Sequence, residues 1–305
     1  MKFLVTGAAG FIGSNIVDEI IRKKHEVIAI DNECANNEIF FWNKKASNHR
    51  ISILDLHKIK NLFRGIDFVL HLAAESRITN AINKPSETYL TNVIGTENIL
   101  KLSLENKVKR VVFSSTSSIY GLNKPPNSEN NKEDCLNPYS ISKYTAEKIC
   151  FYYNKNFNLP VTVLRYFNVF GERAPSNGYY APVSSIFLRQ YRENKPLTVV
   201  GNGSNLRDFV YVGDVVKANL QFCLKKQSNK FNTIFNVGSA TNISILKLAK
   251  IFNSKLEFLP KRIGEAKSTL ANIDRIKNTI NWKPKVKINS WILKNIKMKK
   301  NNTTK

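Results

Sequence analysis

The first half of the chain alternates short, continuous apolar runs with longer stretches in which apolar residues recur at helical spacing. The runs are rich in β-branched residues, as expected of strands buried on both faces of a sheet. The predicted strands are residues 2–6, 26–30, 50–54, 67–72, 110–114 and 160–167. The predicted helices are residues 11–23, 56–64, 86–106 and 139–156. This alternation predicts an α/β fold built on a doubly wound parallel sheet.

After Gly171 the predicted elements become shorter. The pattern indicates helices at residues 186–193, 212–224 and 244–252, and strands at 197–200 and 233–237. We therefore expect a main domain at residues 1–170 and a smaller C-terminal α/β lobe for substrate at 171–293, with residues 212–237 returning to the main sheet. Residues 294–305 are polar and basic, and we expect a frayed, flexible tail.

Composition adds an unusual charge to this picture. Of 305 residues, 47 are Lys or Arg and 23 are Asp or Glu, a formal net charge of +24, while 42% are hydrophobic, enough for a large core. From Lys225 onward the chain holds 17 Lys, 2 Arg and only three acids. Such an excess raises the question of nucleic-acid or membrane binding.

The kind of basic residue argues against such a surface. Lys, Asn and Ile together account for 103 residues, whereas Arg, which suits bidentate phosphate contacts, contributes only 12. We interpret the charge as a general drift of composition, with a functional basic surface as the alternative. We expect neither nucleic acid nor membrane as a partner.

The cysteines and the apolar segments bear on the compartment. Cys34, Cys135, Cys150 and Cys223 are widely spaced and include no CxxC pair, which favours reduced thiols, a cytoplasmic location and no metal site. Glycines interrupt the apolar N-terminal stretch, and no signal-cleavage pattern follows it. No uninterrupted apolar run of ~18 residues is present, so we expect no transmembrane helix.

Residues 5–13 read VTGAAGFIG and place glycines at 7, 10 and 13, between the first predicted strand and helix. In a Rossmann fold the first glycine allows a sharp turn, the second lets the backbone approach a pyrophosphate, and the third lets helix and strand pack closely. Asp31 follows 18 residues after Gly13, where an acid accepts from a ribose 2′-OH and repels a 2′-phosphate. Because no Lys or Arg occurs in the next ten residues, the pattern predicts NAD and not NADP.

Two further strand ends are candidates for cofactor contacts. Asp55 and Leu56 follow the third predicted strand, where an acid can contact the adenine amine. Residues 72–74 (Leu-Ala-Ala) end the fourth, where small residues let the backbone run beside the diphosphate. We interpret the preceding His71 as a strand-end histidine with satisfied hydrogen bonds, and not as a catalyst.

Tyr139 and Lys143 stand four residues apart, so on a helix they share one face. A nearby ammonium, together with a positive nicotinamide ring, lowers the pKa of a tyrosine from its ordinary ~10 and makes it a usable base. The pair follows the hydroxyl-rich segment 114–118 (SSTSS), at the end of the fifth predicted strand where ligands bind in open α/β sheets. A hydroxyl there can relay or orient a proton.

The motifs TGAAGFIG, HLAA, SSTSSIYG, PYSISK and RYFNVFGER, with Asp31, resemble the extended short-chain dehydrogenase/reductase family. Within it the chain is most similar to nucleotide-sugar 4-epimerases, such as UDP-glucose and UDP-N-acetylglucosamine 4-epimerases, from Met1 to about Trp291. The resemblance implies an NAD that is retained through turnover. It implies that Tyr139 takes the proton of the sugar 4-OH, that Lys143 holds the cofactor ribose and tunes Tyr139, and that Thr116 hydrogen-bonds the 4-oxygen.

The resemblance also implies a set of binding residues. Asn168, Arg207 and Arg262 match contacts to the diphosphate of a sugar nucleotide, and Glu265 matches an acid that binds its ribose. The expected cofactor-binding residues are Gly7, Gly10, Phe11, Ile12, Gly13, Asp31, Asn32, Asp55, Leu56, Leu72, Ala73, Ala74, Ser114, Tyr139, Lys143 and Phe167. The expected substrate-binding residues are Thr116, Asn168, Arg207, Arg262, Glu265 and Thr269.

The implied reaction inverts C4 of a UDP-hexose, either UDP-glucose/galactose or the N-acetyl forms, through a transient 4-keto sugar. Related 4,6-dehydratases carry an Asp-Glu pair after the catalytic Thr, and decarboxylases carry a Glu near there. This chain has Ser117 and Ser118 instead, which favours an epimerase. The alternatives are a UDP-glucuronate 4-epimerase, a 4,6-dehydratase or a reductase of the same family and, more distantly, an RNA-binding member without sugar turnover.

Two features bear on substrate size and assembly. Thr269 lies four residues after Glu265, where a bulky residue in the resembled epimerases excludes N-acetyl groups, so a small residue predicts that N-acetylated UDP-hexoses are accepted. The predicted helices 86–106 and 139–156 carry more apolar surface than one sheet face needs. Two such helices form the dimer interface of the resembled family, so we expect a homodimer.

Overall fold

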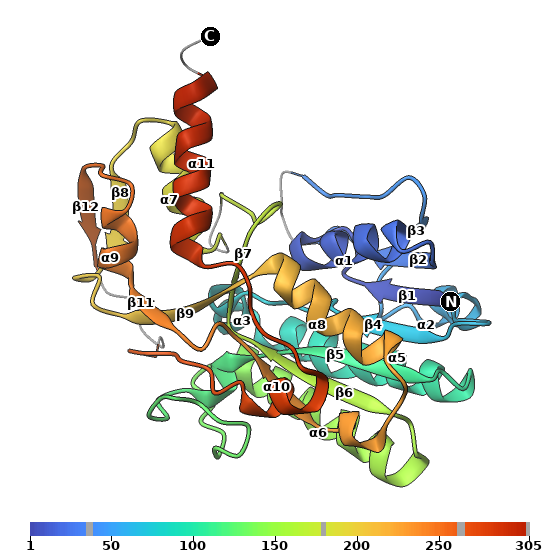
Figure 1. The fold of residues 1–305 in the computed structure, drawn as a ribbon. Coiled ribbons are helices and arrows are strands. Elements are labelled where there is room, and N and C mark those ends of the chain that lie inside the picture. The colour runs from blue at the N-terminus through green and yellow to red at the C-terminus, as the bar shows by residue number, and fades with distance from the viewer. Residues whose placement is uncertain (35–38, 178–180, 261–265, 303–305) are drawn as a thin grey trace.

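A seven-stranded sheet forms the centre of the computed structural model (Figure 1). The structure describes residues 1–34, 39–177, 181–260 and 266–302. The strands of the sheet are β1 (Lys2–Thr6), β2 (Glu26–Asp31), β3 (Ser47–Arg50), β4 (Phe68–His71), β5 (Arg110–Thr116), β6 (Val161–Tyr166) and β10 (Ile234–Val237). All are parallel and lie in the order β10-β6-β5-β4-β1-β2-β3. The chain thus begins in the middle of the sheet and winds outward in both directions, which confirms the predicted α/β fold.

Helices cover both faces of this sheet. α1 (Phe11–Arg22), α8 (Val212–Leu224) and α10 (Asp274–Ile280) share one apolar core, and α2 (Leu56–Ile59), α5 (Gly95–Glu105) and α6 (Pro138–Phe157) share the other. Alternate strand residues point to opposite faces, so Phe3 and Val5 enter the first core whereas Leu4 enters the second. Burial on both faces explains why the strands read as continuous hydrophobic runs.

Helix α6 begins at a strong local signal. Asn137 Oδ1 accepts the Ser140 N–H at 3.0 Å, and Ser140 Oγ accepts the Asn137 N–H at 3.2 Å, which completes a capping box. Pro138 occupies the first helical turn, where its missing N–H is no loss. Asn158 closes the helix in the left-handed conformation. These signals set where the helix begins, and hence where Tyr139 lies.

The helix predicted at residues 86–106 is interrupted. After α3 (Ile78–Asn83) the chain forms α4 (Pro85–Tyr89), then a π-helical turn η2 (Leu90–Ile94), and then α5. A π turn accommodates one more residue than an α turn and is frequent at functional sites. Here the turn carries the buried Asn92, whose side chain holds the backbone of Glu75 through hydrogen bonds of 2.8 Å in both directions.

A smaller lobe stands beside the sheet (Figure 1). It contains strands β7 (Asn168–Phe170), β8 (Leu197–Val200), β9 (Leu206–Tyr211), β11 (Asn242–Ser244) and β12 (Leu256–Leu259), and helices α7 (Val183–Arg192), α9 (Ile245–Lys250) and α11 (Ile288–Asn302). Its strands form a sheet of order β11-β9-β7 and a β12-β8 pair. Phe170, Phe187, Phe252 and Trp291 fill its separate core. Between the lobe segments, residues 212–237 return to the main sheet as α8 and β10.

Several elements differ from the sequence pattern. β3 covers Ser47–Arg50, several residues before the run 50–54 that predicted it, and residues 51–53 instead line a cavity. Strands β7, β9, β11 and β12 are additional, as are helices α3, α10 and α11. The tail that we expected to fray from residue 294 continues helix α11 to Asn302. The described ranges also contain three 3-10 helices: η1 (Lys60–Phe63), η3 (Ser117–Tyr120) and η4 (Asn229–Phe231).

The described part of the chain also bears on membranes and metals. Each of its helices is too short or too polar to cross a bilayer. Within the same ranges, no three His, Cys, Asp or Glu side chains gather as potential metal ligands. The four cysteines are free.

Candidate functional site

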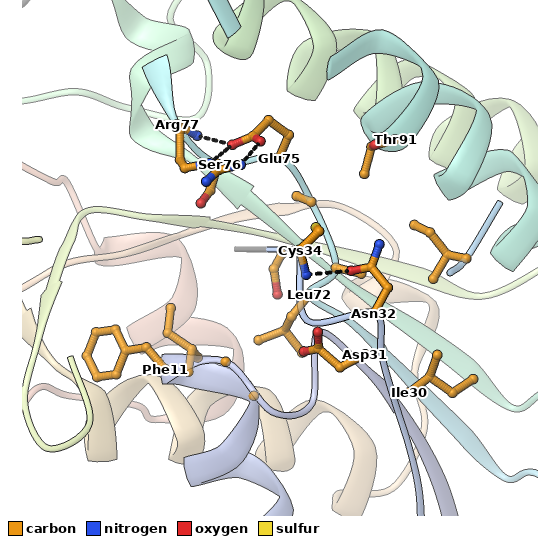
Figure 2. A pocket seen from close by; sticks show the side chains of 18 of the residues that line it. Phe11, Ile30, Asp31, Asn32, Cys34, Leu72, Glu75, Ser76, Arg77 and Thr91 are labelled. Carbon is orange, nitrogen blue, oxygen red and sulfur yellow. Dashed lines mark hydrogen bonds and ion pairs between the residues drawn. The ribbon is translucent and has the colours of Figure 1, made fainter. Parts of the chain in front are cut away.

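A cavity of about 300 Å³ lies at the carboxyl ends of the central strands (Figure 2). This edge is where open α/β sheets bind ligands. Most of the expected cofactor-binding residues line it, namely Gly7, Gly10, Phe11, Ile12, Gly13, Asp31, Asn32, Leu72, Ala73, Ala74, Ser114, Tyr139 and Lys143. The lobe contributes Pro175 and Pro182 to the opposite wall, so the cavity lies between the sheet and the lobe.

The glycine turn forms one wall of the cavity. Gly7 has a φ of +66°, and a Cβ on it would lie 2.8 Å from the Ala73 amide nitrogen. A Cβ on Gly13 would lie 2.0 Å from the Gly7 carbonyl oxygen, so only glycine lets α1 approach the turn. Helix α1 begins at Phe11, and the N–H groups of its first turn have no acceptor within the helix. The turn therefore offers the donors and the space that a diphosphate requires.

Asp31 ends β2 beside this turn (Figure 2). Its carboxylate accepts the Glu33 N–H at 2.8 Å and the Ala9 N–H at 3.0 Å. Burial raises the pKa of Asp31, and these two hydrogen bonds oppose the rise. Carboxylate oxygens each have two lone pairs, so the group can still accept from ribose hydroxyls. Together with the turn, this acid fits a dinucleotide such as NAD.

Tyr139 and Lys143 reach the cavity from one face of α6. Burial raises the pKa of Tyr139, a hydrogen bond with Thr116 opposes the rise, and the charge of Glu75 adds to it. Burial also lowers the pKa of Lys143 to about 8, while its Nζ lies 4.1 Å from the centre of the Phe113 ring. The sequence suggested that Lys143 lowers the tyrosine pKa, but in the structure burial dominates at both groups.

The hydroxyl-rich end of β5 is held by local hydrogen bonds. Thr116 caps η3 by accepting the Ser118 N–H at 3.1 Å, and its hydroxyl donates to Ser118 Oγ at 3.1 Å. Ser114 lines the cavity, and its Oγ lies 3.0 Å from the Tyr166 hydroxyl. The Thr116 hydroxyl thus lies beside Tyr139 with its orientation restrained, as a proton-relaying group needs.

His71 has the structural role that we expected. Its Nδ1 lies 2.7 Å from Thr6 Oγ1 and its Nε2 lies 3.0 Å from Thr96 Oγ1. Burial lowers the pKa of His71 to about 3, and the charge of Lys143 acts in the same direction. A neutral imidazole with both nitrogens engaged holds β1, β4 and α5 together and has no free atom for chemistry.

Three expected cofactor residues lie away from the cavity lining. Asp55 caps α2 by accepting the Lys58 N–H at 3.3 Å, and it pairs with the Lys58 ammonium at 2.7 Å. Leu56 opens that helix and packs against the core. Phe167 is buried and stacks on Tyr120. β3 ends at Arg50 and not at residue 54 as predicted. Residues 51–53 therefore line the cavity, and Asp55 lies beyond the lining.

Three of the described substrate candidates lie on the lobe side, whereas Thr116 ends β5. Asn168 Nδ2 donates to the Asp208 carbonyl at 2.8 Å and lies 3.4 Å from Thr269 Oγ1. Thr269 Oγ1 also accepts the Asp208 N–H at 3.2 Å. Arg207 precedes Asp208 on β9 and donates to the Leu206 carbonyl at 3.0 Å. Asn168, Arg207 and Thr269 thus lie close together, whereas Arg262 and Glu265 lie outside the described residues.

Sequence reasoning missed a charged pair in the cavity wall. The Glu75 carboxylate accepts from Arg77 Nε and Nη2 at 2.5 Å each (Figure 2). It also accepts from Asn80 Nδ2 at 2.6 Å. Both Glu75 and Arg77 line the cavity, and the charge of Glu75 acts on Tyr139. The only local signal was their position directly after the HLAA motif. The π turn that carries Asn92 fixes this loop, and a continuous helix would have placed it differently.

Known proteins resemble this chain over nearly its whole length. A sequence model described as "NAD dependent epimerase/dehydratase family" matches residues 3–238. A protein of Methanocaldococcus jannaschii, provisionally named a UDP-glucose 4-epimerase, is 35% identical over 309 residues and covers 98% of both chains. A UDP-N-acetyl-alpha-D-glucosaminuronate decarboxylase of Bacillus cytotoxicus is 36% identical over 267 residues, or 82% of this chain and 78% of its own length.

A solved structure shows the same likeness in three dimensions. The UDP-glucose 4-epimerase of Thermotoga maritima, determined with UDP-glucose, matches with a TM-score of 0.92 at 31% identity and covers all of both chains. The similar proteins therefore share one fold and act on UDP-sugars, but they do not share one reaction.

Proposed function

The chain belongs to the NAD dependent epimerase/dehydratase family, and from that membership we propose that it inverts C4 of a UDP-hexose through a transient 4-keto sugar. The observation that carries the proposal is that Tyr139 and Lys143 meet at a cavity that fits a dinucleotide, with Thr116 beside Tyr139. The similarity to named UDP-glucose 4-epimerases supports the choice of reaction.

NAD is the cofactor of this enzyme family. The glycine turn at Gly7, Gly10 and Gly13 would hold its diphosphate, Asp31 its adenosine ribose, and Lys143 its nicotinamide ribose. When bound, NAD accepts a hydride from the sugar C4 and returns it. The chain itself must then bind the UDP-sugar, move one proton and exclude water.

Proton transfer falls to Tyr139. Its Oη takes the proton of the 4-OH as C4 is oxidised, and it gives the proton back when C4 is reduced. Thr116 hydrogen-bonds Tyr139 and orients the same substrate oxygen. Between the two steps C4 is planar and the sugar can rotate, while Asn168 and Arg207 on the lobe hold the diphosphate in place. A fixed diphosphate and a mobile sugar are what inversion at C4 requires.

The hydroxyls after Thr116 favour epimerisation over elimination or decarboxylation. Dehydration of the 4-keto sugar needs a group that removes a proton at C5 and another that protonates the leaving oxygen. Ser117 and Ser118 offer no carboxylate for either task, and Ser118 is already bonded to Thr116. The carboxylate of Glu75 is engaged by Arg77 and Asn80.

The test is product analysis. Purified protein is incubated with UDP-glucose, UDP-N-acetylglucosamine and UDP-glucuronate, and the products are identified by NMR. We expect the C4 epimer of at least one neutral hexose. A 4-keto-6-deoxy product would point to a dehydratase, and a pentose with carbon dioxide would point to a decarboxylase. Either result would overturn the proposal.

We further propose that N-acetylated UDP-hexoses are accepted, because Thr269 is small. Thr269→Tyr is expected to abolish turnover of UDP-N-acetylglucosamine and to spare UDP-glucose. Because Thr269 Oγ1 accepts from Asp208 and Asn168, Thr269→Val serves as the control for loss of the hydroxyl alone. Equal loss of both substrates in Thr269→Tyr would contradict the proposal.

We also propose that the enzyme is a cytoplasmic homodimer. Its four cysteines are free, which suits a reducing compartment. Exposed apolar side chains gather on the packed group of α4, η2 and α6, namely Tyr89, Leu90, Ile94, Ile141, Tyr152 and Phe157. Exposed apolar side chains grouped on packed helices are typical of a protein interface.

A further inference from the structure

A buried ion pair lies behind the wall of the cavity. Glu147 stands one helical turn beyond Lys143 on α6, so Tyr139, Lys143 and Glu147 share one face of the helix. The Glu147 side chain is 1% exposed. Its Oε1 accepts from Ser115 Oγ at 2.5 Å and from Arg165 Nε at 2.9 Å, and its Oε2 accepts from Arg165 Nη2 at 2.6 Å. Through Ser115, which lines the cavity, this pair reaches the site itself.

Stability alone is a weak explanation for this pair. Arg165 is 4% exposed, its guanidinium lies 4.9 Å from the centre of the Tyr120 ring, and its buried Nη1 has no hydrogen-bond partner among the described residues. Burial pushes the pKa of Arg165 down, but the hydrogen bonds and charge of Glu147 outweigh it, so the pKa stands above its ordinary value. Removing two charges from water costs several kcal/mol per ion, and apolar residues of similar size often give equal or better stability.

Lys143 is the group that needs a nearby carboxylate. It faces His71 from β4 and the Phe113 ring from β5, and on its own helix it faces Cys150 and Glu147. His71 is neutral and hydrogen-bonded to threonines, so it supplies no negative charge. Burial lowers the pKa of Lys143 to about 8; a thiolate at Cys150 would oppose that change, and the Glu147 carboxylate opposes it. The Cys150 thiol is itself fully buried, and burial raises its pKa, so it stays neutral.

We propose that Glu147 is a positioning residue: its buried carboxylate keeps Lys143 protonated at working pH and holds Ser115 in the cavity wall, while Arg165 supplies the counter-charge that keeps Glu147 in place. The inference rests on the proposed function, because a protonated Lys143 matters only where Tyr139 transfers a proton. Glu147 touches neither substrate nor reacting atoms and acts through Lys143.

The first test is Glu147→Gln, which keeps the shape of the side chain. NAD affinity of the cofactor-stripped protein is measured from pH 6 to 10 by titration calorimetry, and the epimerase rate is measured over the same range. We expect the alkaline loss of NAD affinity to move down by about one pH unit, so that binding is about tenfold weaker near pH 8.5 and within about twofold of wild type near pH 6. An unshifted profile would overturn the proposal. Glu19→Gln, at an exposed pair with Arg22, is the matched control.

A second variant separates positioning from folding. Glu147→Gln leaves Arg165 buried and unpaired, so the double variant Glu147→Gln/Arg165→Gln removes both charges. If Glu147 acts on Lys143, the pH at which NAD affinity is lost stays lower than in wild type in the double variant. If the pair is only structural, NAD affinity in the double variant is lost at the same pH as in wild type. NAD binding can be measured without turnover. Wild-type protein that epimerises no UDP-hexose would therefore refute the proposed function, while the pH dependence of NAD affinity in the variants could still be interpreted.

Discussion

At Tyr139, burial changes the pKa of the phenol in the direction opposite to the one that a catalytic base needs. Burial raises the pKa of the phenol, so removing its proton is harder than in water. Burial lowers the pKa of Lys143 to about 8, so its ammonium is retained at neutral pH with little margin. When the pKa of a group lies close to the working pH, neighbouring charges can change its protonation state, and such groups are common at active sites. The chemistry of the site therefore depends on the few charges around these two residues.

Replacing the base tests its role. Tyr139→Phe is expected to lower the epimerase rate by about 10³-fold, because general acid–base groups contribute roughly 10²–10⁴-fold. Bound NAD, released by denaturation and measured by absorbance, should stay at the wild-type level. Tyr144→Phe is the matched control, since Tyr144 lies on the same helix and bonds Glu133. Turnover by Tyr139→Phe close to wild type would contradict the assignment.

His71 makes stability depend on pH. Its folded pKa of about 3 lies below the ordinary 6.5, so the unfolded chain binds the extra proton between these values. Stability contributed by neutral His71 is therefore present above pH 6.5 and is lost as the pH falls toward 3. At pH 7 the His71→Gln variant should be less stable than wild type. Between pH 7 and pH 4, however, its free energy of unfolding should fall by about 3 kcal/mol less than that of wild type. Urea unfolding at both pH values measures this, and an equal loss in both proteins would contradict it.

Short sequence motifs were sufficient to predict several residues of the cavity lining. The glycine turn, Asp31, and the pair Tyr139 and Lys143 each need only a few consecutive positions and one neighbouring element. Asp55 was expected at the cavity because an apolar run was read as a strand up to residue 54, but β3 ends at Arg50. Glu75 could not be placed, because its position depends on Asn92 in a turn that periodicity does not reveal.

At the scale of elements, the hydrophobic pattern predicted the strands of the main sheet that are buried on both faces. Strands β1, β4, β5 and β6 are covered on both faces, and their continuous apolar sequences reveal them. β7, β11 and β12 span only three or four residues each, and β11 and β12 are only partly buried, so their sequences carry little periodic signal. The sequence pattern predicted no part of helix α11, although Trp291 and Ile292 anchor its start in the lobe core, and Lys294 and Lys297 are exposed.

The exposed helical face predicts the assembly state. Leu90 in η2 is 52% exposed and Tyr152 in α6 is 55% exposed. We expect wild-type protein to be a dimer at micromolar concentration and Leu90→Glu/Tyr152→Glu to be a monomer, measured by light scattering after gel filtration. Leu122→Glu, on a loop outside these helices, should leave the dimer intact. A monomeric wild type would contradict the dimer.

At the scale of the whole molecule, the site depends on contacts between distant parts of the chain. Asn168, Arg207 and Thr269 meet because β7 pairs with β9 and because Asp208 bonds Thr269. No local pattern predicts such contacts, and only the family resemblance placed these residues in one site. The division at residue 170 stays a prediction, although the chain does return to the main sheet through α8 and β10.

The net charge also belongs to this scale. The net charge of +24 is concentrated after Lys225, in residues that complete the lobe, add β10 and α10 to the main domain, and form α11. Within the described part of the cavity lining, the charged side chains are Asp31, Glu75, Arg77 and Lys143, which sum to zero. The basic excess therefore lies outside the cavity. There it can speed the approach of an anionic sugar nucleotide without taking part in the chemistry.

The central claim is that C4 is oxidised and then reduced within one enzyme-bound sugar. UDP-glucose that carries deuterium at C4 tests this most directly, with product formed in ordinary water and analysed by NMR and mass spectrometry. We expect UDP-galactose that keeps deuterium at C4, because the deuteride removed from C4 returns to its opposite face. Product with hydrogen from solvent at C4, or no inversion at C4 of any UDP-hexose, would contradict it.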